Sequence, residues 1–193
     1  MDLCFATNNK GKLLEVKSLV SEKYKILSLA DIGCHEELPE TQPDLEGNSR
    51  QKAEYIYRKY KVNCFADDTG LEVEALNGAP GVISARYAGP ACSPEDNMVK
   101  LLTEMQGVEN RKAVFRAIIT LFLNGNVYAF EGKVEGYILK ERRGEKGFGY
   151  DPIFQPAGQN QTFAEMDISL KNEISHRGKA VNKLIGFLNN YKG

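Results

Sequence analysis

The order of apolar and polar residues divides the first third of the chain into short strands and longer helices. A continuous apolar run at residues 3–6 is typical of a short buried strand, and residues 25–29 look like a second strand. After Asn9 and again from residue 45, apolar side chains recur every three or four positions, which is the pattern of one helix face. This spacing predicts one helix that begins after Asn9 and a second over residues 45–61.

The remainder of the chain shows the same alternation of patterns. Ser93-Pro94 is a favoured pair at a helix start. A long β pattern covers residues 112–123, and Asn124-Gly125-Asn126 turns the chain back into residues 127–139, which predicts an antiparallel hairpin. Apolar spacing predicts a last helix over residues 176–191.

Composition limits the class of protein. The chain has 193 residues, which fit one domain with room for two lobes. Its 42% hydrophobic and 26% charged residues are ordinary for a globular protein with a sizeable core. The formal net charge of −1 argues against a general nucleic-acid binder. A small anionic ligand held by a few Lys and Arg side chains remains compatible with it.

The cysteines and the start of the chain indicate a compartment. The four cysteines are Cys4, Cys34, Cys64 and Cys92. Because they form no Cys-x-x-Cys pair and only two histidines are present, a zinc site is not expected. The thiols are expected to be reduced and the protein cytoplasmic. The first residues lack the pattern of a signal peptide, and the apolar run 117–123 is too short to cross a membrane.

One segment, Phe65-Ala66-Asp67-Asp68-Thr69-Gly70-Leu71, carries two adjacent carboxylates between apolar runs. Asp is a poor strand residue and Gly70 permits a positive φ, so the segment predicts a turn that presents both acids to a cleft, before a new strand at 71–76. Oxygen ligands at such a turn suit Mg²⁺. Alternatively, Asp67 and Asp68 bond only local backbone, as in an Asx turn.

A second candidate site follows the first predicted strand. Thr7, Asn8 and Asn9 are favoured N-cap residues, and the next helix opens with Lys10-Gly11-Lys12. A strand, a polar turn and a helix start place backbone N–H groups where an anion can bind. The spacing lacks the leading glycine of a Walker motif. The alternative is a capped helix whose two lysines are solvated.

Three further stretches carry candidate chemistry. The acidic loop of residues 30–46 can supply a second metal ligand, although a charged surface loop explains most of its acids. The stretch 147–152 places Phe148 between two glycines beside an Asp, which suits either stacking on a base or filling the core. The cations of Ser175-His176-Arg177 at a helix start suggest an anionic or oxygen-rich ligand, or else a solvated first turn.

Five motifs occur together in one order and carry a family resemblance. They are Thr7-Asn8-Asn9-Lys10-Gly11-Lys12, Phe65-Ala66-Asp67-Asp68-Thr69-Gly70-Leu71, Pro80-Gly81 with Ser84-Ala85-Arg86-Tyr87, Gly147-Phe148-Gly149-Tyr150-Asp151-Pro152, and Ser175-His176-Arg177-Gly178. With them the chain resembles the inosine triphosphate pyrophosphatase family, the dITP/XTP diphosphatases, over nearly its whole length. The resemblance implies an elongated α/β fold with a long twisted mixed β-sheet flanked by helices. It implies a single domain, residues 1–193, with two lobes around a central substrate cleft, usually as a homodimer.

The resemblance also implies an activity. Members are Mg²⁺-dependent hydrolases that convert ITP, dITP and XTP to the monophosphate and pyrophosphate, which removes deaminated purines from the nucleotide pool. Attack at the α-phosphorus is implied by the family alone. The alternatives are a pyrophosphatase for other modified nucleotides, a nucleotide-binding sensor without turnover, and a structural domain whose polar turns are only caps.

The roles of family residues transfer to matching positions of this chain. Asp68 is implied as Mg²⁺ ligand and proton acceptor, Asp67 as its support, and Glu40 as a second metal ligand. The implied substrate-binding residues are Thr7, Asn8, Asn9, Lys10, Gly11, Lys12, Lys52 and Thr69, together with Phe148, Gly149, Tyr150, Asp151, Lys171, His176 and Arg177 at the base or sugar. One departure is Ser49, where the family has Ala.

Hydrogen-bond chemistry supports the implied choice of base. Hypoxanthine and xanthine carry an acceptor at position 6, where adenine carries a donor, so cationic side chains there would face adenine donor against donor. A buried bond left unmade costs about 1–3 kcal/mol, which is roughly tenfold to a hundredfold per contact. Guanine shares the 6-oxo group, so its rejection must depend on its 2-amino group.

Overall fold

The computed structural model describes residues 1–21, 23–91 and 93–191, so Cys92 lies outside the described residues. The strands are β1 (Asp2–Phe5), β2 (Lys25–Leu27), β3 (Cys64–Val73), β4 (Pro80–Gly81), β5 (Lys112–Leu123), β6 (Asn126–Ile138) and β7 (Phe154–Pro156). The helices are α1 (Lys10–Leu19), α2 (Leu45–Tyr60), α3 (Pro94–Glu104), α4 (Ile168–Ile174) and α5 (His176–Asn190). Short 3-10 turns lie at Ala30–Ile32, Glu74–Leu76, Ser84–Arg86 and Asp151–Ile153.

The strands form a mixed sheet, and the predicted α/β class is confirmed. Among the described residues the strand order is β2-β1-β3-β5-β6-β7, with β4 beside β3. β1 is parallel to both β2 and β3, whereas β4 is antiparallel to β3, and β7 to β6. β5 and β6 are joined by Asn124 and Gly125, both with positive φ, as the predicted tight hairpin requires.

The chain divides into two compact units. Unit 1 contains Met1–Asp68, Ala117–Gly132 and Arg177–Gly193, and unit 2 contains Thr69–Arg116 and Lys133–His176. The boundary between them falls within β3, β5 and β6, so each of these strands contributes one part to each unit.

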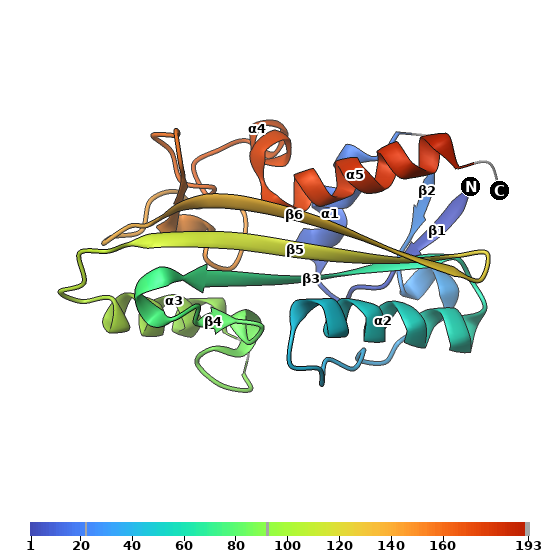
Figure 1. Cartoon of the computed structure of the whole chain (residues 1–193), viewed down its shortest axis with the longest axis horizontal. Helices are drawn as coiled ribbons and strands as arrows, with labels where there is room; N and C mark the ends of the chain where they lie inside the picture. Colours follow the sequence, from blue (N-terminus) through green and yellow to red (C-terminus); the bar gives the residue numbers. More distant parts are fainter. Residues whose placement is uncertain (22, 92, 192–193) are drawn as a thin grey trace. The chain divides into compact units, whose positions relative to one another are not determined.

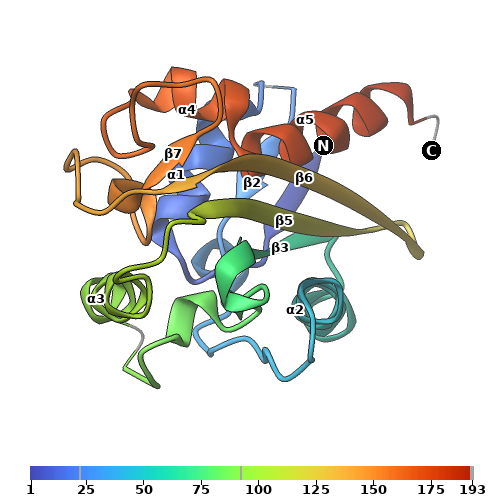
Figure 2. The same cartoon turned by 60° about the vertical axis from the view of Figure 1, so that its left-hand side comes forward.

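Unit 1 has three layers. Figures 1 and 2 show α1 and α5 on one face of its strands and α2 on the other. On the first face, apolar residues of α1 and α5 pack on β1, β3 and β5, and these include Val16, Leu184, Phe5, Phe65 and Ile119. On the second face, Ala53 and Ile56 of α2 pack on Cys4, Cys64 and Ala66. Strands buried on both faces explain the continuous apolar runs in their sequence.

The ends of the helices in unit 1 follow local sequence chemistry. The Asn9 side chain caps α1 by accepting a hydrogen bond from the backbone N–H of Lys12. Asp44 caps α2 in the same way through Gly47, and Lys61 closes that helix in the left-handed conformation. The helices predicted from apolar spacing are confirmed within a residue or two of their ends.

The predicted turn at Asp67 to Gly70 is wrong. β3 continues without interruption from Cys64 to Val73, and Gly70 is not among the glycines with positive φ. The predicted strand at 71–76 is the end of β3, and residues 74–76 form a 3-10 turn. Asp is unfavourable in a strand because its carboxylate lacks partners there. Here, side chains from other elements supply those partners.

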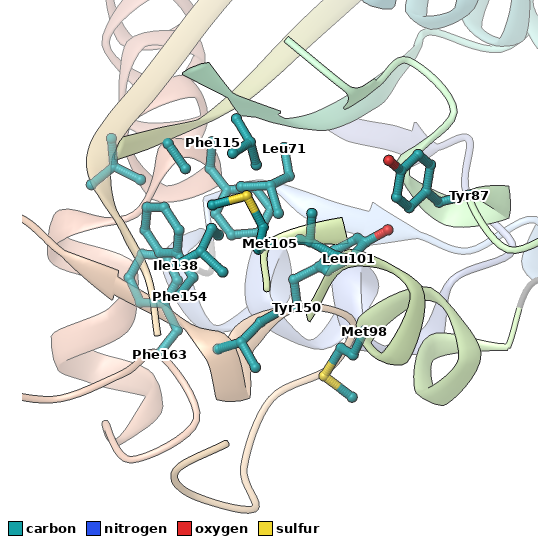
Figure 3. Packing of buried hydrophobic residues seen from close by; sticks show 14 of the residues in the cluster. Leu71, Tyr87, Met98, Leu101, Met105, Phe115, Ile138, Tyr150, Phe154 and Phe163 are labelled. Atoms are coloured by element: carbon teal, nitrogen blue, oxygen red, sulfur yellow. The ribbon is translucent and has the colours of Figure 1, made fainter. Parts of the chain in front are cut away.

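Unit 2 contains a single large aromatic and aliphatic cluster among its described residues. Figure 3 shows Met98 and Leu101 of α3 gathered with Leu71 and Phe115 of the strands. The rings of Phe115 and Phe154 meet edge to face at a centroid distance of 4.7 Å, a geometry that aromatic pairs favour. This cluster gives unit 2 a hydrophobic core of its own.

No helix within the described residues is both long and apolar enough to cross a membrane.

Candidate active site

The turn between β1 and α1 gathers polar side chains and the start of a helix within unit 1. The Thr7 hydroxyl accepts a hydrogen bond from the backbone N–H of Asn9 at 3.1 Å, and the Asn9 side chain accepts one from that of Lys12 at 3.0 Å. Lys10 and Gly11 are the first residues of α1, where backbone N–H groups have no acceptor inside the helix. Those two groups therefore point toward any ligand held at the positive end of the helix.

Asp67 is the centre of a buried ion-pair chain. Its Oδ1 lies 3.0 Å from Lys12 Nζ and its Oδ2 lies 3.0 Å from Arg177 Nε. Arg177 also pairs with Glu15 of α1. Burial disfavours the charged form of Asp67, but the Lys12 ammonium and the Arg177 guanidinium outweigh it, and the pKa of the carboxyl falls below its ordinary value. The two cations thus favour the ionised form of Asp67.

Asp68 has a different environment. Its Oδ2 accepts a hydrogen bond from Asn48 Nδ2 at 3.2 Å, and its Oδ1 lies 3.8 Å from Lys52 Nζ. Lys52 also pairs with Glu40. Burial raises the pKa of Asp68. The Lys52 and Lys12 ammonium groups offset this rise only in part, and the nearby Glu40 and Asp67 carboxylates add to it. This carboxyl can take up a proton far more readily than its neighbour.

Helix α2 supplies the partners of Asp68. Asn48 and Lys52 are four residues apart and therefore project from the same side of the helix. Between them, the Ser49 hydroxyl donates to the backbone oxygen of Ala66 at 3.1 Å and lies 2.8 Å from Thr120 Oγ1. The hydroxyl that departs from the family pattern is therefore satisfied, and it fastens α2 to the strands that carry Asp68.

Two carboxylates, Glu40 and Asp68, are the candidate metal ligands. Within the described part of the chain, no group of three or more His, Cys, Asp or Glu residues could hold a metal ion. Both carboxylates already contact a cation, the Lys52 ammonium. Hard oxygen donors in this number fit Mg²⁺, which commonly takes one or two carboxylates and completes its shell with water and phosphate.

Unit 2 carries the second group of predicted residues. Lys171 Nζ lies 2.6 Å from Asp151 Oδ2 and 4.9 Å from the centre of the Phe148 ring. The same Asp151 oxygen accepts a hydrogen bond from the backbone N–H of Phe148 at 2.8 Å. Gly147 must be a glycine here, because an added Cβ would lie 2.1 Å from this oxygen. Asp151 thus fixes both the aromatic ring and the lysine.

Several predicted substrate residues lie deeper than expected. Tyr150 is buried, and its hydroxyl donates to the backbone oxygen of Ser84 at 2.8 Å, so its ring belongs to the core of unit 2. His176 is buried against Phe115, with ring centres 4.6 Å apart. Arg177 is only 2% exposed and carries ion pairs to carboxylates. Its guanidinium lies against Asp67, whereas the family resemblance implied that Arg177 contacts the base.

Sequence reasoning gave no role to Glu15 or Asn48. Glu15 is a buried acid three residues after Lys12, a spacing that puts both on one side of α1. Asn48 lies four residues before Lys52 on α2, so the two side chains project from the same side of the helix. The available sequence signal for Glu15 was its place next to Val16, which lies on the buried face of α1.

The fold and the site in unit 1 define an α/β protein with a helix start suited to phosphate and a buried carboxylate–lysine cluster next to it. The model of the Ham1 family matches residues 3–187. A dITP/XTP pyrophosphatase of Flavobacterium psychrophilum is 55% identical over 98% of this chain and 100% of its own length. One of Porphyromonas gingivalis is 51% identical over 96% of each chain.

Solved structures agree with these sequence matches. The Staphylococcus aureus Ham1 protein superimposes with a TM-score of 0.87 at 36% identity, covering 98% of each chain. A HAM1 protein from Coxiella burnetii gives a TM-score of 0.90 at 34% identity, covering 99% of this chain and 100% of that one. The chain belongs to the Ham1 family, and the family predicted from its motifs is confirmed.

Proposed function

We propose that this chain is a Mg²⁺-dependent pyrophosphatase of non-standard purine nucleoside triphosphates. Its substrates are ITP, dITP and XTP, and its products are the monophosphate and pyrophosphate. The relatives named dITP/XTP pyrophosphatase match it over nearly their full length. The observation that carries the proposal is the arrangement of one acidic pair, in which Lys12 and Arg177 hold Asp67 while Asp68 contacts Asn48 and Lys52 beside Glu40.

The triphosphate is assigned to the start of α1. Thr7, Asn8 and Asn9 line the turn, and Lys10 and Gly11 offer their backbone N–H groups. Lys12 and Lys52 add positive charge near the two aspartates. Phosphoryl transfer is catalysed mainly by positioning and by neutralising charge, and these groups provide both. Thr69, the residue after Asp68, is assigned to the substrate as well.

Glu40 and Asp68 are the residues that would hold Mg²⁺. Their fit rests on the Lys52 ammonium, which lies against both carboxylates and shows that the pair is arranged around positive charge. When bound, the metal would polarise phosphate oxygens and neutralise their charge. Lys52 would then leave the two carboxylates and bind the negatively charged phosphate groups instead.

Asp68 is assigned as the proton acceptor for the attacking water. A general base works best when its pKa is not far below the working pH, and burial with two neighbouring carboxylates raises the pKa of Asp68. Asn48 donates to one carboxylate oxygen and so fixes the orientation of the group. Asp67 supports it by holding Lys12 in place.

The base is assigned to unit 2. The Phe148 ring would stack on the purine, since it is only half-buried and Asp151 fixes its loop. Lys171 and His176, with the backbone of Gly149, Tyr150 and Asp151, would line the base and read the 6-oxo acceptor. Because Arg177 is committed to Asp67 and Glu15, its contribution to base reading is assigned as indirect.

Residues 1–193 are assigned to one catalytic domain with two lobes. The enzyme is assigned to the cytoplasm and to a homodimer. No nucleic-acid or membrane partner is assigned, in keeping with a net charge of −1.

Pyrophosphate release from ITP, XTP, GTP, ATP and dTTP tests the proposal. The expected result is release from ITP and XTP with Mg²⁺, lost in EDTA. Equal release from all five would keep the catalytic assignment and remove the base assignment. Release from dTTP alone would favour a pyrophosphatase for other nucleotides. Binding without release would favour a sensor.

A further inference from the structure

The loop that carries Glu40 is fastened to α2 near the start of that helix. The backbone N–H of Thr41 donates to Gln51 Oε1 at 2.9 Å, and Gln51 Nε2 donates back to Thr41 Oγ1 at 2.8 Å. The backbone N–H of Gln42 donates to Asn48 Oδ1 at 2.9 Å. This attachment holds one end of the segment around Glu40, because Thr41 directly follows it.

A second attachment lies at Glu36, near the end of α2. Its carboxylate accepts hydrogen bonds from Tyr55 Oη at 2.6 Å and Tyr60 Oη at 2.7 Å. The Lys59 ammonium lies 2.7 Å and 2.8 Å from its two oxygens. These donors, Lys59 first, lower the pKa of Glu36 to about 2. Both carboxylate oxygens are therefore bound to α2, which fastens the loop at a point before Glu40 in the sequence.

Glu36 also reaches the anion site. Its backbone oxygen accepts a hydrogen bond from Asn8 Nδ2 at 3.4 Å. Asn8 is exposed and belongs to the turn that opens α1. One residue therefore ties together three parts of unit 1: helix α2, the loop of Glu40 and the turn assigned to the triphosphate.

We propose that Glu36 is a positioning residue, which fixes Glu40 for the metal ion and Asn8 for the triphosphate. The inference rests on the proposed function, since it assigns Glu40 and Asn8 their ligands. Between the two attachments the loop holds Pro39 and has no regular secondary structure to keep it in place. Without the Glu36 attachment, the segment that carries Glu40 is held to α2 at one end only, through Thr41 and Gln42.

The position of Glu36 determines which measured quantities change. Within the part of the chain that the structure describes, Glu36 contacts Asn8, Tyr55, Lys59 and Tyr60 but not Asp68, the assigned proton acceptor. Once metal and substrate are bound, the reacting groups are the same with or without it. Loss of the attachment therefore weakens binding of metal and substrate and leaves the saturated rate nearly unchanged.

Glu36→Gln tests this inference, with Glu37→Gln as the matched control. Glu37 is the next residue, is exposed and has no hydrogen bond or ion pair with the described residues. Binding of Mn²⁺ alone is measured from the loss of its free electron paramagnetic resonance signal. KM for ITP and kcat are measured at saturating Mg²⁺, and thermal unfolding is followed for each variant.

The expected result is a selective loss of binding. Glu36→Gln raises the Mn²⁺ dissociation constant and KM by about fivefold to tenfold, the scale of one ordinary hydrogen bond, and kcat changes less than about twofold. Glu37→Gln matches wild type. Equal Mn²⁺ affinity in the two variants, or a lower unfolding temperature with unchanged Mn²⁺ affinity, overturns the inference.

A second variant covers the case in which Glu36→Gln does not fold. Tyr55→Phe removes one donor and preserves the ring, so its Mn²⁺ dissociation constant rises if Glu36 is a positioning residue and stays at the wild-type value if it is not. A wild-type chain that binds no Mn²⁺ overturns the inference directly. A wild-type chain that binds Mn²⁺ but releases no pyrophosphate from any triphosphate overturns the proposed function instead.

Discussion

Asp67 and Asp68 are consecutive residues of one strand, yet the two sides of that strand give them opposite properties. Successive side chains of a strand point to opposite faces. Asp67 meets Lys12 of α1 and Arg177 of α5, which lie on one face of unit 1. Asp68 meets Asn48 and Lys52 of α2 on the other. The pKa is lowered for the first carboxyl and raised for the second.

The difference shows how one dipeptide can supply both an anchor and a base. Two full cations contact Asp67 directly, so its charge is neutralised in place and binds α1 and α5 to the strand. Asp68 contacts the neutral Asn48 amide and the Lys52 ammonium, which Glu40 also contacts. Burial and the nearby Glu40 and Asp67 carboxylates raise its pKa, which is the condition under which a buried carboxyl accepts a proton.

The largest expected effect is that of Asp68→Asn on turnover. The amide keeps the size of the side chain but cannot accept the proton from water, so kcat should fall by about 10²–10⁴-fold, the usual contribution of a general base. Nucleotide binding, measured by calorimetry with ITP in EDTA, should persist. Near-normal turnover by this variant would remove Asp68 from the mechanism.

Asp67→Asn should act on stability first. It leaves the buried Lys12 and Arg177 charges without their carboxylate, and breaking a buried pair in this way costs about 3–5 kcal/mol. Urea unfolding monitored by circular dichroism measures the loss. Asp68→Asn is the comparison, and it should change the free energy of unfolding far less. An equal loss in the two variants would contradict the division into anchor and base.

Arg177→Lys separates the two possible roles of the arginine. Lysine keeps one charge but cannot bridge Asp67 and Glu15 with a planar fork. If Arg177 acts through Asp67, kcat/KM should fall by about tenfold, the size of one charged hydrogen bond, for ITP and ATP alike. A fall for ITP alone, seen as a reduced ITP-to-ATP ratio, would return Arg177 to direct base reading.

The pH dependence of stability should differ in sign between the two acids. The pKa of Asp67 is lower in the folded state than the ordinary value of about 3.9, so its stabilisation is present above that value and is lost as pH falls through the folded pKa. The pKa of Asp68 is raised in the folded state, so its contribution is present below about 3.9 and is lost as pH rises through the folded pKa.

Unfolding by urea across a series of pH values measures both contributions. Asp67→Asn should flatten the loss of stability in acid, and Asp68→Asn should remove the loss that wild type suffers as pH rises through the folded pKa of Asp68. Identical pH profiles for the two variants would show that the two faces of β3 do not shift the pKa values of Asp67 and Asp68 in opposite directions.

The amino-acid sequence by itself determined the main helices, the β5–β6 hairpin and the family. Local signals were enough for the helix starts at Asn9 and Ser93 and for the Asn124-Gly125 hairpin, because each depends on residues a few positions apart. The five motifs identified the family because their residues and their order along the chain can be read without any knowledge of the fold.

Only the tertiary structure decided what each charged group does. Asp67 meets Lys12 across 55 residues and Arg177 across 110 residues of chain, and no local pattern encodes such pairs. The turn expected at Asp67 and Asp68 is a strand, because these distant cations satisfy a carboxylate that would otherwise disfavour one. Arg177 lies at Asp67, and Glu36 is tied to α2, for the same reason. Charge compensation depends on which helices pack on each face of the sheet.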